Sequence, residues 1–495
     1  MYPCLSIEGA QFGGYDDSSS GSSSPVSSRS GPSESDGSSS SNADEFCPDP
    51  YPSKSDSPSS SSVRGRGGVD PTSLLTASSA CVLDDIDRHR QRMLALLPAF
   101  SSPAGAPARA EPLFRWLSGF GVGWVLDMDA SVSGGAAERL PRREVGRRVR
   151  AWAQALGTME RVFRLRHREL TVKQVQALGE LAAASAGAML RLARAVAALE
   201  SSPSKLLAAL DVYVPVSEAF PVLGRMFSWG PSHPVSAAAE GALAALVDAA
   251  RSCGRDLRAF VRSHYPWRMP QGGEVHPCVG FWMGYFRCLL RNRISLCFIL
   301  GGDGDGEDAP PPLAPGSEGG CGLLTELISC LEAVLEEKSA ALAFPGLRQV
   351  FMLNNTFAIV RRAVRSDLKL FLPPGWVRAR EERMEGYIKG YMDASWAPVV
   401  ARLNDASGGP KLPAVLRRRT TNRLSAFYSA LENACSAQRC WKVPNPVLRG
   451  ILRKTVSANV VPAYRRYQED HPEVDVAIGR SAEELEQRLS DLFEG

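Results

Sequence analysis

The residues that could bind a metal lie along the chain without the spacing that a metal site needs. His264, His276 and Cys278 are near one another in the sequence, but the chain contains no CxxC pair and no HxxxH pair. Zinc sites usually include such a tight pair, so the spacing predicts no zinc site here. His276 is instead expected to order the turn before a helix that starts near Val279.

An acidic stretch, Asp303–Asp308, begins like a calcium-binding loop. The EF-hand loop requires a glycine at its sixth position and a glutamate at its twelfth. The sixth position here is Asp308, and three prolines follow at residues 310–312. We interpret this stretch as a solvated linker, and no metal or other cofactor is expected.

Catalytic motifs are absent from the sequence. It contains no GxxxxGK[ST] phosphate loop, no GxGxxG after a strand-like segment and no GxSxG nucleophile elbow. Carboxylates are plentiful, but no pair of them lies in an apolar setting that would separate their pKa values for acid and base roles. The sequence therefore predicts that the protein is not an enzyme.

Basic residues are concentrated near the C-terminus. Residues 411–466 contain 12 Lys plus Arg and one acidic residue, Glu432, whereas residues 467–495 contain nine acidic residues and two Arg. An ordinary solvated face explains most charge runs, but such faces usually mix both signs. A field of one sign indicates an anionic partner, either lipid phosphate or nucleic acid. Motifs that read nucleic acid are not evident, so no nucleic acid is expected.

The N-terminal part differs in composition from the rest. Residues 18–62 hold 22 serines in 45 positions, and such a segment buries too little apolar area to offset its ordering entropy. We predict a disordered Ser/Gly/Pro-rich tail over residues 1–80, either without function or open to phosphorylation. Residues 81–137 are predicted to form a short helix, Cys81–Leu97, followed by linker segments that begin with Pro98–Pro112.

From Glu138 to Gly495, apolar residues recur at helical spacing and strand signals are nearly absent. This pattern predicts an all-α domain of stacked antiparallel helices. Two helix starts are clear, because Asn445 precedes a proline and Ser481 stands three residues before a glutamate. Asn354 and Asn355 fall inside an apolar helix pattern, so they are expected to hydrogen-bond that helix to its neighbour.

Membrane contact is expected to be peripheral. The N-terminus lacks the pattern of a signal peptide, and the apolar run Ile294–Leu300 is too short to span a bilayer. Neither a myristoylation site nor a prenylation box is present. The eleven cysteines include no CxxC pair, which suits a reducing compartment better than a disulfide framework.

Four stretches together resemble one family. The paired asparagines after FML precede a Tyr387-x-x-x-Tyr391-x-x-x-x-Trp396 spacing, as in the seventy-kilodalton subunit of the exocyst, a vesicle-tethering complex. Its Gly-x-x-His-Pro segment, its C-terminal signature and its ending resemble GGEVHPCVGFWMGYFRCLL (Gly272–Leu290), RLSAFYSALENACSAQRCWKVPNPVLRGILRKTVSANVVPAYRRY (Arg423–Tyr467) and SAEELEQRLSDLFEG (Ser481–Gly495). The resemblance covers residues 138–495 and is closest in style to plant members.

The resemblance carries several expectations. It implies an elongated rod of antiparallel helical bundles over residues 138–495. It implies that the protein tethers secretory vesicles in exocytosis as a cytoplasmic protein, peripheral at the inner face of the plasma membrane. Other exocyst subunits and anionic phosphoinositide lipids are the expected partners, and small GTPases or immune receptors are open as further ones. The candidate lipid-binding residues, on the family's C-terminal basic surface, are Arg449, Arg453, Lys454, Arg465 and Arg466.

One departure from the family leaves two functions open. Typical members begin with a long helical segment that pairs with other subunits, whereas this sequence has the serine-rich stretch, one predicted short helix and a proline linker there. The first function is a tethering subunit of the exocyst. The alternative is a non-enzymatic interaction scaffold, or a decoy in immunity, that keeps the fold without stable exocyst assembly.

Overall fold

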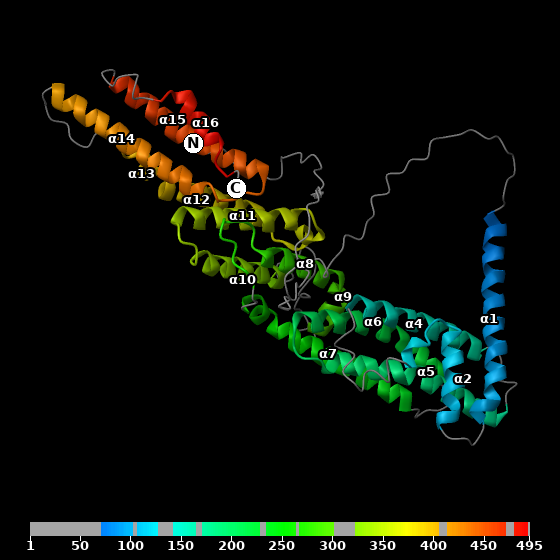
Figure 1. Ribbon diagram of the computed structural model, residues 1–495. Helices are drawn as coiled ribbons and strands as arrows, with labels where there is room; N and C mark the ends of the chain where they lie inside the picture. The colour runs from blue at the N-terminus through cyan, green and yellow to red at the C-terminus, as the bar shows by residue number, and fades with distance from the viewer. Residues whose placement is uncertain are drawn as a thin grey trace, which may run out of the picture. The chain divides into compact units, whose positions relative to one another are not determined.

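The computed structural model describes residues 71–101, 106–126, 142–164, 171–227, 234–263, 267–300, 322–404, 413–471 and 480–493. Within these ranges all regular structure is helical and no strand occurs (Figure 1). The predicted all-α fold of helical bundles is therefore confirmed. The serine-rich stretch and the acidic stretch Asp303–Asp308 lie outside the described residues.

The chain divides into two compact units, each of which is described by itself. Unit 1 comprises the described residues within Val261–Arg287 and Pro315–Gly495, and unit 2 those within Asp49–Phe260 and Cys288–Ala314. The predicted domain boundaries at residues 80 and 137 stay predictions. The first helices, from Pro71 onward, pack with other helices of unit 2.

Unit 2 is a helical bundle in which α4 packs along α6, and α5 contacts both α1 and α6. The Trp152 indole donates to the Ser185 carbonyl at 3.1 Å and joins α4 to α5, while Arg225 pairs with Glu160 at 2.6 Å and joins α6 to α4. Its helices are α1 (Pro71–Ser101), α2 (Ala106–Ser118), α4 (Arg142–Arg164), α5 (Val172–Ala198), α6 (Pro203–Met226), most of α7 (Pro234–Arg262) and α9 (Arg293–Leu300).

The first two helices are longer than the sequence predicted. Helix α1 begins at Pro71 instead of Cys81 and continues past Pro98, and α2 covers Pro112. Proline inside a helix removes a hydrogen bond and disfavours the preceding turn. Here Met93, Leu97 and Phe100, as well as Trp116 and Leu117, are buried. Burial of these side chains outweighs the local preference for a linker.

Two helices of unit 2 are long and apolar enough to cross a membrane by length and composition alone, Val175–Ala198 and Pro203–Met226. In each, 56% of the most apolar window is buried inside the protein. Both pack against neighbouring helices of the same unit. This burial is what core helices of a bundle show, so these two helices give no argument for a membrane span.

Helix starts and breaks follow local sequence signals. Ser202 accepts a hydrogen bond from the Lys205 amide at 3.1 Å, and Pro203 is the first residue of α6. The apolar stretch Val279–Leu300 does not form a single helix. It is broken into α8 (Pro277–Arg291) and α9 at Asn292, whose amide bonds to the Leu289 carbonyl with the shorter spacing of a helix end.

Unit 1 contains the family-like stretches except for the last three residues of Gly272–Leu290, which belong to unit 2. Both predicted helix starts are confirmed: Asn445 accepts from the amides of Val447 and Leu448, and Ser481 forms a capping box with Glu484. Its helices are α8 up to Arg287, α10 (Gly322–Ser339), α11 (Pro345–Val364), η5 (Asp367–Phe371), α12 (Trp376–Ser395), α13 (Ala397–Val400), α14 (Pro413–Gln438), α15 (Pro446–Asp470) and α16 (Ala482–Ser490).

The two asparagines of α11 join that helix to two distant segments, as the sequence predicted. The Asn354 amide donates to the Gly273 carbonyl at 2.8 Å and to the Lys442 carbonyl at 3.0 Å. The Asn355 side-chain oxygen accepts from the His276 backbone amide at 2.8 Å. Both asparagines are buried, as are Gly273 and His276, so their bonds satisfy two backbone groups that have little access to water.

The segment that these asparagines hold needs a glycine at one position. Gly273 has φ +81°, and a Cβ there would stand 2.8 Å from the Leu347 side chain. Only glycine adopts this conformation without strain and also lets α11 approach so closely. The backbone amide of Lys442 donates to the Gly272 carbonyl at 2.8 Å, which completes the link among the three segments.

The C-terminal segment docks onto the core of unit 1. Phe493 is buried and its ring centroid lies 6.0 Å from that of Tyr391. The Tyr391 hydroxyl donates to Gln438 at 2.6 Å and accepts from the Trp396 indole at 2.7 Å. The Arg453 guanidinium donates to the Leu492 carbonyl at 2.8 Å. The described C-terminal residues Leu492 and Phe493 thus contact α15 and α12, respectively.

We expect Asn355→Ala to lower the local stability of α11. The substitution leaves the buried His276 amide without its acceptor, which costs about 1–3 kcal/mol of the free energy of opening. Native-state hydrogen exchange should show the loss in α11 amides. Arg362→Ala, at an exposed position of the same helix, is the control and should change opening by less than about 0.5 kcal/mol. Equal protection in the two variants would contradict this account of the asparagine.

Arg453→Ala is expected to release the C-terminal segment. Without the guanidinium, the Leu492 carbonyl loses its donor, so the peptide that ends at Phe493 should exchange amide hydrogens about tenfold faster, equivalent to about 1.4 kcal/mol. Hydrogen exchange with mass spectrometry measures that peptide directly. The control is Lys454→Ala, at the adjacent exposed position. If both variants exchange like the wild type, Arg453 does not hold the segment.

Candidate functional site

The five candidate lipid-binding residues all lie on α15, but they do not share one face. Arg449 and Arg453 are half-buried. Arg453 is bound to the Leu492 carbonyl, and the Nε of Arg449 is buried with no hydrogen-bond partner among the described residues. These two side chains are therefore only partly exposed on the surface of α15. Because α15 packs against other helices on two sides, some of its basic side chains point toward the interior of the unit.

The other three candidates are exposed. Lys454 and Arg465 are eleven residues apart, about three helical turns, so they project from the same side of α15. Arg466 follows at about 100° around the helix axis. These three residues remain available to an anionic surface and are named here the exposed basic set of α15.

The acidic tail returns next to the basic region. Helix α16 packs on α15, and Glu483 of α16 lies 3.8 Å from Arg465. Glu432 pairs with Arg480 and Arg488, each at 2.8 Å. Hydrogen bonds from these two arginines lower the pKa of Glu432. Charges that are separate in the sequence are therefore mixed in space, and the local field is weaker than the count over residues 411–466 suggested.

His276 contributes to the fold at the start of α8. Its Nδ1 accepts a hydrogen bond from the Cys278 amide at 3.2 Å and orders the start of α8, as predicted. Burial lowers the pKa of His276 to about 4, so the ring is neutral at physiological pH. Among the described residues no group of three or more His, Cys, Asp or Glu could hold a metal ion. His264 lies outside those residues.

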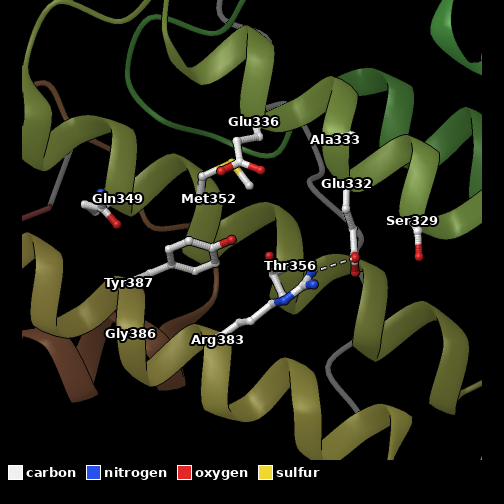
Figure 2. Close-up of a pocket in the computed structure, with 10 residues that line it drawn as sticks. All are labelled: Ser329, Glu332, Ala333, Glu336, Gln349, Met352, Thr356, Arg383, Gly386 and Tyr387. Carbon is white, nitrogen blue, oxygen red and sulfur yellow. Dashed lines mark hydrogen bonds and ion pairs between the residues drawn. The ribbon is translucent and has the colours of Figure 1, made fainter.

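Unit 1 also contains a groove that no sequence motif indicated. It encloses about 620 Å³ between α10, α11 and α12 (Figure 2). Figure 2 shows Met352 of α11 at its floor, with Glu336 of α10 and Tyr387 of α12 on opposite sides. Burial is the main cause that raises the pKa of the Tyr387 hydroxyl. The complete lining is Ser329, Glu332, Ala333, Glu336, Gln349, Met352, Thr356, Arg383, Gly386 and Tyr387.

A buried ion cluster ties the two walls of the groove together. Arg380 of α12 forms two hydrogen bonds of 3.0 Å with Glu332 of α10, and Arg383 adds a third at 2.9 Å. The Arg380 guanidinium also lies 4.3 Å from the centre of the Trp376 ring. Helical spacing places Ser329, Ala333 and Glu336 on one face of α10, but only the packing of three helices turns that face into a groove.

Comparisons with known proteins agree on one family. The family model for the C-terminal region of the Exo70 exocyst complex subunit matches residues 154–491. Among the similar proteins, exocyst complex component EXO70B2 of Arabidopsis thaliana is 28% identical over 316 residues, which are 62% of this chain and 50% of the relative. Exocyst complex component EXO70A1 of the same plant is 25% identical over 336 residues, 65% of this chain and 52% of the relative.

A solved structure is also similar. It is the crystal structure of the Saccharomyces cerevisiae exocyst component Exo70p, with a TM-score of 0.44 and 14% identity, over 86% of this chain and 91% of that one. The chain spans about half the length of the Arabidopsis relatives that it matches. The relatives agree with the predicted plant branch, and the chain belongs to the Exo70 family of exocyst subunits, which are not enzymes.

Proposed function

We propose that this protein acts as an exocyst subunit that tethers secretory vesicles to the plasma membrane. The observation that carries the proposal is the match of the Exo70 C-terminal model to residues 154–491, which include most of both compact units. In this role the protein is cytoplasmic, lies at the inner face of the plasma membrane and contacts other exocyst subunits. Small GTPases and immune receptors stay predictions that rest on the resemblance alone.

We further propose that the protein binds anionic phosphoinositides through the exposed basic set of α15, Lys454, Arg465 and Arg466. Their exposure and the shared side of Lys454 and Arg465 support this choice. Arg449 and Arg453 are left out because both are half-buried and Arg453 holds the C-terminal segment. Glu483 next to Arg465 reduces the expected attraction, so the lipid contact is expected to be weaker than the sequence count implied.

The tethering role predicts that other members of the exocyst co-purify with the tagged full chain from cells that express it. The matched control is an unrelated helical protein with the same tag at equal expression. Recovery of several exocyst members above this control supports the proposal. If the folded chain recovers none of them, the tethering role is wrong, and the interaction scaffold or decoy becomes the better explanation.

The lipid role predicts a loss of vesicle binding when the exposed basic set is reversed to Glu. Each basic residue near an anionic bilayer contributes about 1 kcal/mol, so three lost contacts weaken binding roughly a hundredfold. Co-sedimentation with phosphatidylcholine vesicles containing phosphatidylinositol 4,5-bisphosphate measures this. Binding should also fall as salt rises, because exposed charges are screened.

A second triple variant controls for net charge in this measurement. Lys369, Lys389 and Arg402 are exposed residues of the same unit outside α15, and their reversal to Glu gives the same change in net charge. We expect this variant to sediment like the wild type, with circular dichroism confirming that both variants fold. Equal losses in the two variants would show that binding depends on total charge and not on α15.

A further inference from the structure

The groove between α10, α11 and α12 has a shape that can accommodate a helix. Its wall residues on α10, Ser329, Ala333 and Glu336, cover two helical turns, about 10 Å along the axis. Thr356 and Met352 of α11 form its floor and are both buried. A helix laid over α11 would therefore contact α10 on one side and α12 on the other.

The centre of the groove is apolar and open. Met352 supplies a flexible thioether that adapts to different partners. Ala333 and Gly386 face it from the two walls with the smallest side chains available (Figure 2). A Cβ built on Gly386 would have no atom within 4 Å, so no described residue fills the space in front of it. A large apolar side chain of a partner fits this centre.

The charges at the groove have opposite signs on its two walls. Glu336 is exposed on α10 and has no ion-pair partner among the described residues. Arg383 on α12 is 54% exposed and shares the single carboxylate of Glu332 with Arg380, so this cluster keeps one excess positive charge. Glu336 would repel an anionic lipid headgroup, and Arg383 would repel a purely basic peptide. A complementary ligand therefore carries both positive and negative charges.

We propose that this groove binds an amphipathic helix of a partner protein. The helix inserts one apolar side chain over Met352, sets a basic residue against Glu336 and sets an acidic residue against Arg383. Docked helices of this kind use anchor residues at i, i+3, i+4 and i+7. This spacing matches that of the wall residues on α10. This contact is separate from the lipid-binding surface on α15, and it goes beyond membership of the exocyst, since it states the chemistry of the bound segment.

The test uses a displayed library of helical peptides as the probe. Four positions on one face (i, i+3, i+4 and i+7) are randomised, and the others are fixed as good helix formers. Selection against the full-length protein should enrich peptides that combine an apolar anchor with one basic and one acidic residue. Enrichment of like-charged pairs, or no enrichment at all, would overturn the proposal.

Variants of the protein then locate the bound peptide. Gly386→Leu fills the centre and should weaken binding about a hundredfold or more, equivalent to at least about 2.8 kcal/mol. A helix-interior glycine is a poor helix former, so the substitution should not unfold α12. Gly450→Leu is the matched control, since Gly450 lies in α15 and a Cβ there also meets nothing within 4 Å. Equal binding to both variants would place the peptide elsewhere and overturn the proposal.

Charge reversal tests the assigned polarity of the groove. Glu336→Lys should weaken the selected peptide about tenfold, and exchange of the basic residue of the peptide for Glu should restore the lost affinity. Circular dichroism verifies that the variant folds. If the exchanged peptide binds Glu336→Lys no better than the original does, the basic residue does not face Glu336 and the proposed orientation is wrong.

Discussion

The side-chain amides of Asn354 and Asn355 hold together three segments of unit 1 that are far apart in the sequence. Their partners are backbone groups of Gly273, His276 and Lys442, and all of these bonds are 3.0 Å or shorter. A buried backbone group without a partner costs more than a hydrogen bond gains, so removal of either amide affects the segment as well as the helix. The start of α8 and the approach to α15 therefore both depend on one turn of α11.

This arrangement explains which parts of the fold could be predicted from the sequence. Two adjacent asparagines inside an apolar helix pattern require hydrogen-bond partners, which is why their role was predictable although their partners were not. The starts at Asn445 and Ser481 were predictable because capping is local, within three residues. The path of α1 through Pro98 was not, since it depends on burial of Leu97 and Phe100 against other helices of unit 2.

The candidate lipid surface shows a different limit of sequence reasoning. A count of charges over residues 411–466 treats every basic residue as exposed and every acidic residue beyond them as remote. In unit 1, Arg453 turns to the Leu492 carbonyl, and Glu483 lies beside Arg465. Both contacts join residues far apart in the sequence, so no local pattern indicates them. Among the five candidate residues, only Lys454, Arg465 and Arg466 are exposed, and their role in lipid binding stays a proposal.

The groove depends on the same kind of long-range contact. Glu332 and Arg380 are both buried, and a buried ion pair is stable only when its geometry and further hydrogen bonds are good. Here the pair is bidentate, Arg383 adds a third bond, and the Trp376 ring covers Arg380. This cluster fixes α10 and α12 at one end of the groove while Ala333 and Gly386 leave its centre open. A rigid frame around an open centre lets a partner helix bind without first ordering its receptor, which lowers the entropic cost of association.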